Sequence, residues 1–366
     1  MSDVIDALVP LHAASPLHAV RHQRDKVVAA TQGSYDAIFD PALPGLSLAE
    51  RLLAAQTVAR LSGSTVLEAH YRDRLSATPP DGERVQAILA FAEVLTEHPV
   101  EGDRIALLKL PAAGLSTPEV ITLAQLIAFV AYQVCVVAGL QAIAAIEPDA
   151  AATQTPPDEP ATPFVHPASL PQPGEPVRVN GYTSETLGWK AWLPVVDLDS
   201  ATPEQLAVLE SSHPKAKTSD YYRVLVHQPR ILHERSVVFN AIMYAPGGLS
   251  RAERELASAA VSRINGCVYC ASVHAQRFEQ LTKRNDVIVQ LFTEPQGAGT
   301  STRERAVVQV AIDLTRAPAR FGTPQLQAAR AAGLTPLEIL DLVHAAAIFA
   351  WANRLMLNLG EPVFPA

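Results

Sequence analysis

The most reactive residue types of this 366-residue chain gather in one short stretch, INGCVYCASVHAQRF, at residues 264–278. Cys267 and Cys270 lie three positions apart, His274 follows four positions later, and the chain has only one other cysteine, Cys135. On a helix, positions i, i+3 and i+7 share one face, so this spacing would direct two thiols and an imidazole to the same side. Such a group could form a redox pair, bind a metal or close a disulfide.

A carboxylate, that of Glu255, is expected beside this group. Residues 249–264 and the residues from Cys267 onward predict two helices, and an Asn-Gly pair between them suits a left-handed helix end. If the helices fold back on each other, Glu255 and His274 reach levels that differ by roughly 3 Å, because each residue advances a helix by about 1.5 Å. The predicted order in space is Glu255, His274, Cys270 and Cys267.

This order suits thiol chemistry. Only the thiolate is a strong nucleophile, and a free cysteine with a pKa near about 8.5 is mostly protonated at neutral pH. An imidazole can take the proton, and a carboxylate can orient the imidazole and stabilise its cation. We favour Cys270 as the attacking thiol, because it lies one helical turn from His274, and Cys267 as the thiol that resolves a sulfenic acid into a disulfide. The amino-terminal end of the helix would also favour a thiolate at Cys267.

Three other interpretations of the cysteine pair stay open. A structural disulfide would close a very short loop within a helix and stabilise the fold little. A zinc site could use both thiols, His274 and Glu255, although structural zinc sites usually take pairs of ligands from separate segments. The thiols could also be ordinary core residues, as we expect for Cys135 in its long apolar segment.

The chain contains the same unit twice. Residues 46–75 align without gaps on residues 249–278, with about eleven of thirty positions identical, and residues 112–134 align on residues 331–353. In both copies a serine stands three residues before a glutamate at the start of an apolar helical pattern, which is the spacing of a capping box. We find no alternation typical of strands, so the sequence predicts an all-α fold.

The first copy keeps the helical pattern without the reactive residues. In place of Glu255, Cys267, Cys270 and His274 it has Leu52, Ser64, Leu67 and Tyr71. We therefore expect a non-catalytic domain at residues 1–147, a proline-rich linker at residues 148–180 and a catalytic domain at residues 181–366.

Composition argues against several classes of protein. A net charge of −8 without a basic run argues against nucleic-acid binding. Three cysteines in so long a chain do not make a disulfide framework. The amino terminus has no basic segment followed by an apolar run, so we expect a cytoplasmic protein without a signal peptide.

One apolar segment, residues 120–146, has no charged side chain and is long enough to span a membrane. Its counterpart in the second copy carries Asp341, His344 and Arg354. Because this segment carries charged and polar side chains in one of its two copies, burial inside the protein is more plausible than burial in lipid. We therefore expect no membrane association. We expect His344 and the nearby Trp351 and Asn353 to serve packing, with a place in a substrate pocket or in an oligomer contact as the alternative.

The spacing E-x11-C-x2-C-x3-H, formed by Glu255, Cys267, Cys270 and His274, resembles the alkylhydroperoxidase D/carboxymuconolactone decarboxylase superfamily. The surrounding stretch LSRAERELASAAVSRINGCVYCASVH is similar to its peroxidase-related branch, and the first half of the chain resembles the same fold. One position departs from the pattern: Tyr269 stands where the best-studied peroxidases of the family have a histidine directly before the second cysteine.

The resemblance implies two tandem alkylhydroperoxidase D-like helical domains, of which the second is a thiol-dependent peroxidase in antioxidant defence. It implies hydrogen peroxide or an organic hydroperoxide as substrate, a lipoyl-bearing or thioredoxin-like dithiol reductant, and no metal or haem cofactor. The family assembles into trimers or hexameric rings. Fusing two copies in one chain therefore predicts a homotrimer.

Two rival functions are compatible with the sequence. The same fold could carry a lactone decarboxylase or isomerase, which needs no thiol pair. Alternatively, the chain could be a non-enzymatic redox-sensing or scaffold protein that uses its first half to hold a partner.

Overall fold

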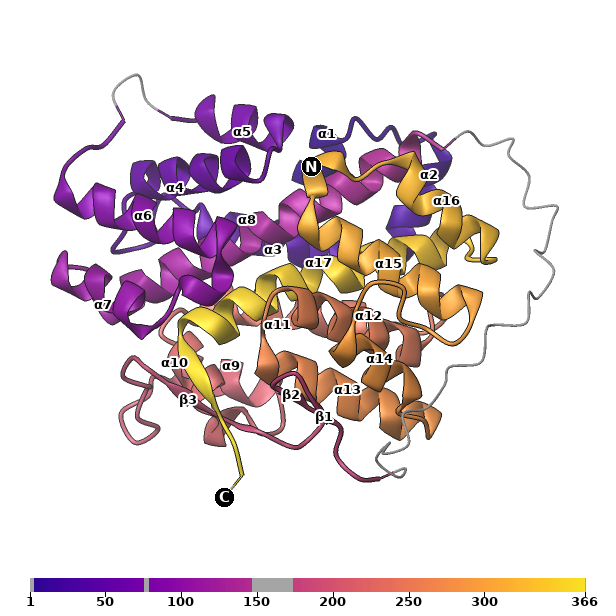
Figure 1. The fold of residues 1–366 in the computed structure, drawn as a ribbon. Helices are drawn as coiled ribbons and strands as arrows, with labels where there is room; N and C mark the ends of the chain where they lie inside the picture. Colours follow the sequence, from indigo (N-terminus) through magenta and orange to yellow (C-terminus); the bar gives the residue numbers. More distant parts are fainter. Residues whose placement is uncertain (1–2, 76–78, 147–173, 366) are drawn as a thin grey trace.

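Two long apolar helices, α8 (Thr117–Ala144) and α17 (Pro336–Asn358), pack side by side through the middle of the structure (Figure 1). The computed structural model describes residues 3–75, 79–146 and 174–365. Each of the two helices begins with a capping box and a proline in its first turn, which together satisfy free backbone N–H groups and preset the helical φ angle. Both helices are buried on nearly all sides, so neither shows the one-sided polarity of a surface helix.

The remaining helices of the described residues form two sets whose α-helices follow the same order, except that the second set has one helix more. The first half contains α1 (Val4–Leu8), α2 (Pro16–Arg21), η1 (His22–Arg24), α3 (Asp25–Ile38), α4 (Leu48–Leu61), α5 (Thr65–Arg72), α6 (Glu83–Glu97), η2 (Pro99–Glu101) and α7 (Arg104–Ala112) before α8. The second half contains α9 (Pro203–Ser212), η3 (Ala216–Thr218), α10 (Asp220–Leu225), α11 (Pro229–Met243), α12 (Arg251–Ile264), α13 (Val268–Thr282), α14 (Asp286–Thr293), α15 (Thr302–Arg316), η4 (Pro318–Arg320) and α16 (Thr323–Ala331) before α17.

The sequence repeat corresponds to a repeat of structure. Helix α4 begins at Leu48 and α12 at Arg251, an offset of 203 residues, and the helices before them recur at nearly the same offset. From α6 at Glu83 and α15 at Thr302 onward the offset is 219 residues, because α13 is longer than α5 and α14 is added. The prediction of an all-α fold is confirmed.

The two halves share one apolar core instead of forming two separate ones. Helix α8 packs against its own counterpart α17, and α3 packs against its counterpart α11. Figure 1 shows α4–α7 to one side of this central group and α12–α16 to the other. Such pairing of like elements is the arrangement of a two-fold dimer, achieved here within one chain.

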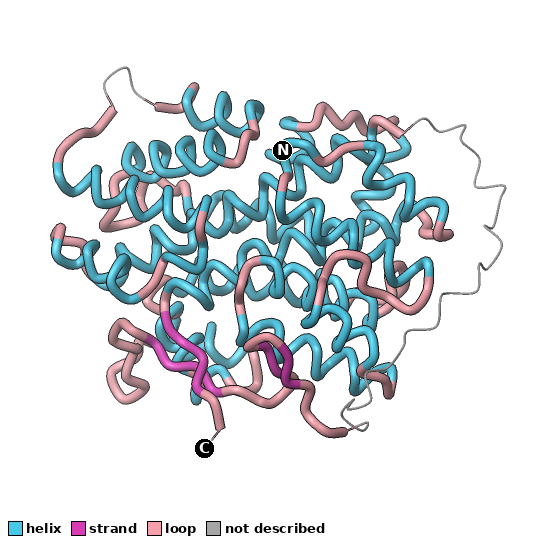
Figure 2. Tube along the Cα trace, in the orientation of Figure 1, coloured by secondary structure: helices cyan, strands magenta, loops and turns pink. Residues whose placement is uncertain are grey.

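Four short strands are the exceptions to the helical fold within the described residues, and they lie near the carboxyl terminus (Figure 2). Strand β1 (Arg178–Val179) pairs with β2 (Tyr182–Thr183), and β3 (Gly188–Ala191) pairs antiparallel with β4 (Gly360–Val363). Of the predicted linker, residues 148–173 lie outside the described part of the chain, and residues 174–180 lead into the first of these hairpins.

Helices α8 and α17 are each long and apolar enough to cross a membrane by length and composition. Every residue of the most apolar window of α8, and 89% of that of α17, is buried inside the protein. This burial is typical of core helices.

A buried carboxylate, Asp341 on α17, joins the two halves. It accepts hydrogen bonds from Arg24 of the first half at 2.7 Å and from Arg254 on α12 at 2.8 Å. The same helix carries His344, whose pKa is lowered to about 4 by burial and by the neighbouring arginines. His344 is therefore neutral at pH 7 and serves the core, as expected.

The close approach of α8 to α17 depends on Gly139, where an added Cβ would lie 2.3 Å from Cγ1 of Val343. We expect Gly139→Val to lower the free energy of unfolding by about 1–3 kcal/mol, because the side chain overpacks the helix interface. Urea unfolding followed by circular dichroism measures the change. Combining it with Val343→Ala should recover part of the loss, whereas strictly additive losses would contradict a clash between these two positions.

Candidate active site

The predicted helical hairpin is present as α12 and α13. Helix α12 begins with the expected capping box of Ser250 and Glu253 and ends at Ile264. Gly266 makes the turn with φ of +75°, where a Cβ would also lie 2.4 Å from Val100 of the first half. Cys267 then caps α13 in an extended conformation, so the chain reverses direction between Glu255 and the thiols.

The hairpin brings Glu255 and His274 into contact. Nδ1 of His274 forms a short hydrogen bond with Oε2 of Glu255, and Arg251 donates through Nε to Oε1 at 2.5 Å. Glu255 is fully buried and His274 is 7% exposed. The predicted pairing of these two residues is therefore present, with Arg251 as an additional partner that was not predicted.

The charge state of Glu255 fixes the tautomer of His274. Burial by itself raises the pKa of Glu255, but His274 and Arg251 outweigh it and hold that pKa below its ordinary value. An ionised carboxylate only accepts hydrogen bonds, so Nδ1 of His274 carries a proton. Nε2 is then the ring nitrogen available for proton exchange.

Both thiols are free and buried. Cys267 is 1% exposed and Cys270 is 4% exposed, and they lie at the start of α13 on the face that also carries His274. Burial, reinforced by the adjacent Cys270, raises the pKa of Cys267 well above its ordinary value. Cys267 is therefore protonated in the reduced protein at pH 7.

Asn353 on α17 holds the turn that carries Cys267. Its amide donates to Oγ of Ser262 at 3.0 Å, its carbonyl accepts from Asn265 at 3.0 Å, and it hydrogen bonds the thiol of Cys267. We expected Asn353 mainly to pack. The sequence does contain a signal for this role. The first copy has Val134 at the aligned position, so only the copy with thiols has a polar residue there, and that residue is fully buried.

Tyr269 lies between the two cysteines and is half-buried. Burial, with Cys270 and other neighbours contributing, raises its pKa to about 12. The hydroxyl stays neutral near pH 7 and cannot relay protons as a histidine at this position would.

The corresponding place in the first half is filled with packing residues. Leu52 and Leu67 are buried, and the hydroxyl of Tyr71 donates a short hydrogen bond to Gln133. Ser64 begins α5 there, without forming a side-chain cap. The described residues at this location thus contain no thiol, no imidazole and no carboxylate in register.

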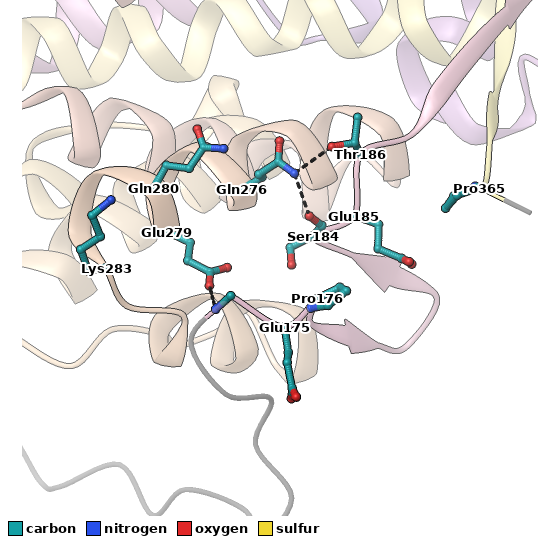
Figure 3. A pocket seen from close by; sticks show the side chains of 11 residues that line it. Glu175, Pro176, Ser184, Glu185, Thr186, Gln276, Glu279, Gln280, Lys283 and Pro365 are labelled. Carbon is teal, nitrogen blue, oxygen red and sulfur yellow. Dashed lines mark hydrogen bonds between the residues drawn. The ribbon is translucent and has the colours of Figure 1, made fainter.

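A hollow of about 700 Å³ lies elsewhere (Figure 3). It follows the face of α13 that carries Gln276, Glu279 and Lys283, and Gln276 donates to Thr186 at 2.9 Å. At 100° per residue, these positions lie roughly opposite Cys270 and His274. The hollow therefore does not open on the thiols.

Residues 234–313 match the Carboxymuconolactone decarboxylase family, and the match includes Glu255, both α13 cysteines and His274. This segment belongs to the alkylhydroperoxidase D/carboxymuconolactone decarboxylase superfamily. The part of the chain that carries the Glu255–His274 pair is thus a superfamily member, as the spacing of its residues predicted.

Two solved structures are similar to part of the chain. One is an alkylhydroperoxidase AhpD core, an uncharacterized peroxidase-related protein from Ralstonia eutropha JMP134, with 25% identity, 44% of this chain and 86% of that chain covered, and a TM-score of 0.40. The other is an uncharacterized peroxidase-related protein from Silicibacter sp. TM1040, with the same identity and coverage and a TM-score of 0.37. No curated relative matches the chain at a significant level.

The burial of the thiols makes their alkylation selective. In the native reduced protein at pH 7, iodoacetamide should leave Cys267 and Cys135 unlabelled, because burial raises the pKa of both thiols, that of Cys135 to about 12. Labelling of Cys267 should rise only at alkaline pH. Site-resolved mass spectrometry measures this, and the urea-unfolded protein, in which all three thiols should react, is the control. Rapid labelling of native Cys267 at pH 7 would contradict the assignment.

Proposed function

We propose that the second half of the chain is a thiol-dependent hydroperoxide reductase that cycles Cys267 and Cys270 between dithiol and disulfide. The contact between His274 and the buried Glu255, one helical turn along α13 from Cys270, carries this proposal. A carboxylate that orients a histidine beside a thiol is an arrangement that activates a cysteine nucleophile.

In the first half-reaction, Nε2 of His274 takes the proton of Cys270. The thiolate attacks the terminal oxygen of the hydroperoxide, the O–O bond breaks, and the alkoxide leaves as an alcohol with the proton returned by His274. Cys270 has then lost two electrons and is a sulfenic acid. Glu255 stabilises the imidazolium that exists during the transfer.

In the second half-reaction, the sulfur of Cys267 attacks the sulfenic acid of Cys270, and water leaves as the disulfide forms. Cys267 has an extended conformation, with φ of −83° and ψ of 90°, at the cap of α13. It can therefore approach Cys270 without unwinding the helix. A dithiol reductant, lipoyl-bearing or thioredoxin-like, returns two electrons and two protons by thiol–disulfide exchange.

Other features belong to the same proposal. The first half is a non-catalytic copy of the same domain, and the protein acts in the cytoplasm as a homotrimer. A molar mass in solution equal to that of one or two chains, measured by light scattering, would exclude the trimer. The pairing of α3 with α11 and of α8 with α17 supports the view that one chain takes the place of two single domains.

The name of the matched family keeps a lactone decarboxylase as a second candidate. That reaction needs no thiol pair, so full activity in a Cys267→Ser/Cys270→Ser variant would favour it. A redox sensor or scaffold would instead show stoichiometric oxidation without turnover under any reductant.

Oxidation by cumene hydroperoxide tests the thiol cycle. The reduced protein should lose two thiols per chain, and Cys135→Ser, the matched control, should lose two as well. Cys267→Ser should accumulate a sulfenic acid on Cys270 that a dimedone probe traps, whereas Cys270→Ser should trap none. Unchanged thiol counts in the wild type would end the peroxidase proposal, and trapping only in Cys270→Ser would reverse the roles of the cysteines.

The histidine relay makes a separate prediction. We expect His274→Gln to slow oxidation of Cys270 by about 10²–10⁴-fold, the usual contribution of a general base. The rate of thiol loss in stopped-flow experiments measures this effect. The control is His70→Gln in the first half of the chain, which has no thiol pair. There, Nε2 of His70 forms a hydrogen bond of 2.7 Å with the hydroxyl of Tyr35. Equal rates in the wild type and His274→Gln would remove His274 from the mechanism.

A further inference from the structure

Arg235 on α11 is a buried cation without a counter-ion. The residue is 3% exposed, no carboxylate of the described residues pairs with it, and its Nε has no hydrogen-bond partner. Burying a charge without a partner is unfavourable, so such a group calls for an explanation, of which a bound ligand is one. Nε of Arg21 and of Arg254 also lacks a partner, so what distinguishes Arg235 is the absence of a carboxylate or carbonyl acceptor among the described residues.

The other buried arginines have acceptors. Their partners are Asp3 and Asp6 for Arg21, Asp341 for Arg24 and Arg254, and the carbonyls of Ile38 and Asp40 for Arg51. Helix α11 begins 204 residues after α3, and at this offset Arg235 corresponds to Thr31 of the first half. The repeated fold therefore does not need a cation at this position.

A second unpaired donor lies beside Arg235. The guanidinium lies over the ring of Tyr221, 5.5 Å from its centroid, and the Tyr221 hydroxyl is buried without a hydrogen-bond partner. Tyr222 is within hydrogen-bonding reach of Arg235. A guanidinium can only donate, so the chemistry that fits this place is an acceptor with negative charge.

Ring contacts connect this place to the proposed active site. The guanidinium also lies 5.1 Å from the centroid of Phe239, which contacts Phe349 at 6.0 Å. Phe349 in turn lies edge-on to the ring of His274 at 4.3 Å. Two phenyl rings thus form an apolar wall between the unpaired cation and the imidazole.

The surroundings of Tyr221 keep its hydroxyl protonated. Burial raises the pKa of Tyr221, the nearby Arg235 opposes this rise, and charge on Cys270 or Cys267 would raise it further. Tyr222 is partly exposed, so this region extends toward the surface.

We propose that Arg235 and Tyr221 bind the carboxylate of the substrate, which is an organic hydroperoxide with an acidic headgroup and an apolar body. The body lies along Phe239 and Phe349, and the peroxide group reaches Cys270 beside His274. The carboxylate is unchanged in the reaction, and the electrons and protons move as in the thiol cycle. The reduction of this substrate rests on the proposed function, whereas the binding of its carboxylate by Arg235 and Tyr221 does not.

The test compares linoleic acid hydroperoxide with its methyl ester, two probes that differ only in the anionic headgroup. Below their aggregation limits, the acid should oxidise the thiols of the wild type with a second-order rate constant about tenfold to a hundredfold above that of the ester, the range expected for hydrogen bonds to charged groups. Arg235→Met should remove this preference. The control is Arg230→Met on the same helix, whose side chain is 54% exposed and pairs with Asp40, and it should keep the preference.

Several outcomes overturn the inference. Equal rates with acid and ester in the wild type would do so without any variant. A loss in Arg235→Met that leaves the acid–ester ratio unchanged would show that Arg235 acts on the thiolate instead. A large fall in the melting temperature of Arg235→Met would indicate a structural role, because removing an uncompensated buried charge should not destabilise the protein.

Binding is measured separately, so that a failure of the peroxidase proposal can be recognised. Calorimetry with the hydroxy acid product, which cannot oxidise thiols, should show binding to the wild type and to Arg230→Met, and binding weakened at least tenfold in Arg235→Met. If no hydroperoxide oxidises the thiols but the hydroxy acid still binds through Arg235, the function is wrong and the anion site stands. No binding to the wild type would remove the site.

Discussion

The mutual burial of α8 and α17 is the constraint on which the rest of the structure depends. Both helices are apolar on almost every side, so each needs a cover that a single layer of helices cannot supply. The chain provides it by packing the two copies around this pair. Inside the contact, Nε1 of Trp351 donates to Oε1 of Gln125 at 2.9 Å, which fixes the register of one helix on the other.

The same contact builds the candidate active site. Because α17 packs against α12 as well as α8, its side chains reach the helical hairpin from the centre of the molecule. Asn353 then holds the turn at Cys267, and Phe349 covers His274. In the first half, Val134 aligns with Asn353, and two leucines, a serine and a tyrosine occupy the positions of the reactive groups, so the same framework forms ordinary core there.

Among the described residues, the buried carboxylates have oppositely charged partners, whereas the buried Arg235 has none. Asp341 receives two arginines and a backbone N–H, and Glu255 receives an arginine and a histidine, so both buried carboxylates are compensated. Arg235 is left without an acid although it is just as buried. The other buried arginines of the described residues hydrogen-bond carboxylates or backbone carbonyls, so the absence of such an acceptor at Arg235 is particular to this position.

The sequence by itself determined the all-helical fold, the repeat, the capping boxes and the contact of Glu255 with His274. These features are local: a helix advances by a fixed rise per residue, and a hairpin between neighbouring helices leaves little freedom in which residues meet. Only the tertiary structure decided which distant groups complete the site. Asn353 and Phe349 come from α17, and their approach depends on how all the apolar surfaces are buried together, which no short stretch of sequence specifies. The lack of a carboxylate beside the buried Arg235 in the described part of the chain is the clearest case, because a missing partner can be recognised only when every neighbour is in place.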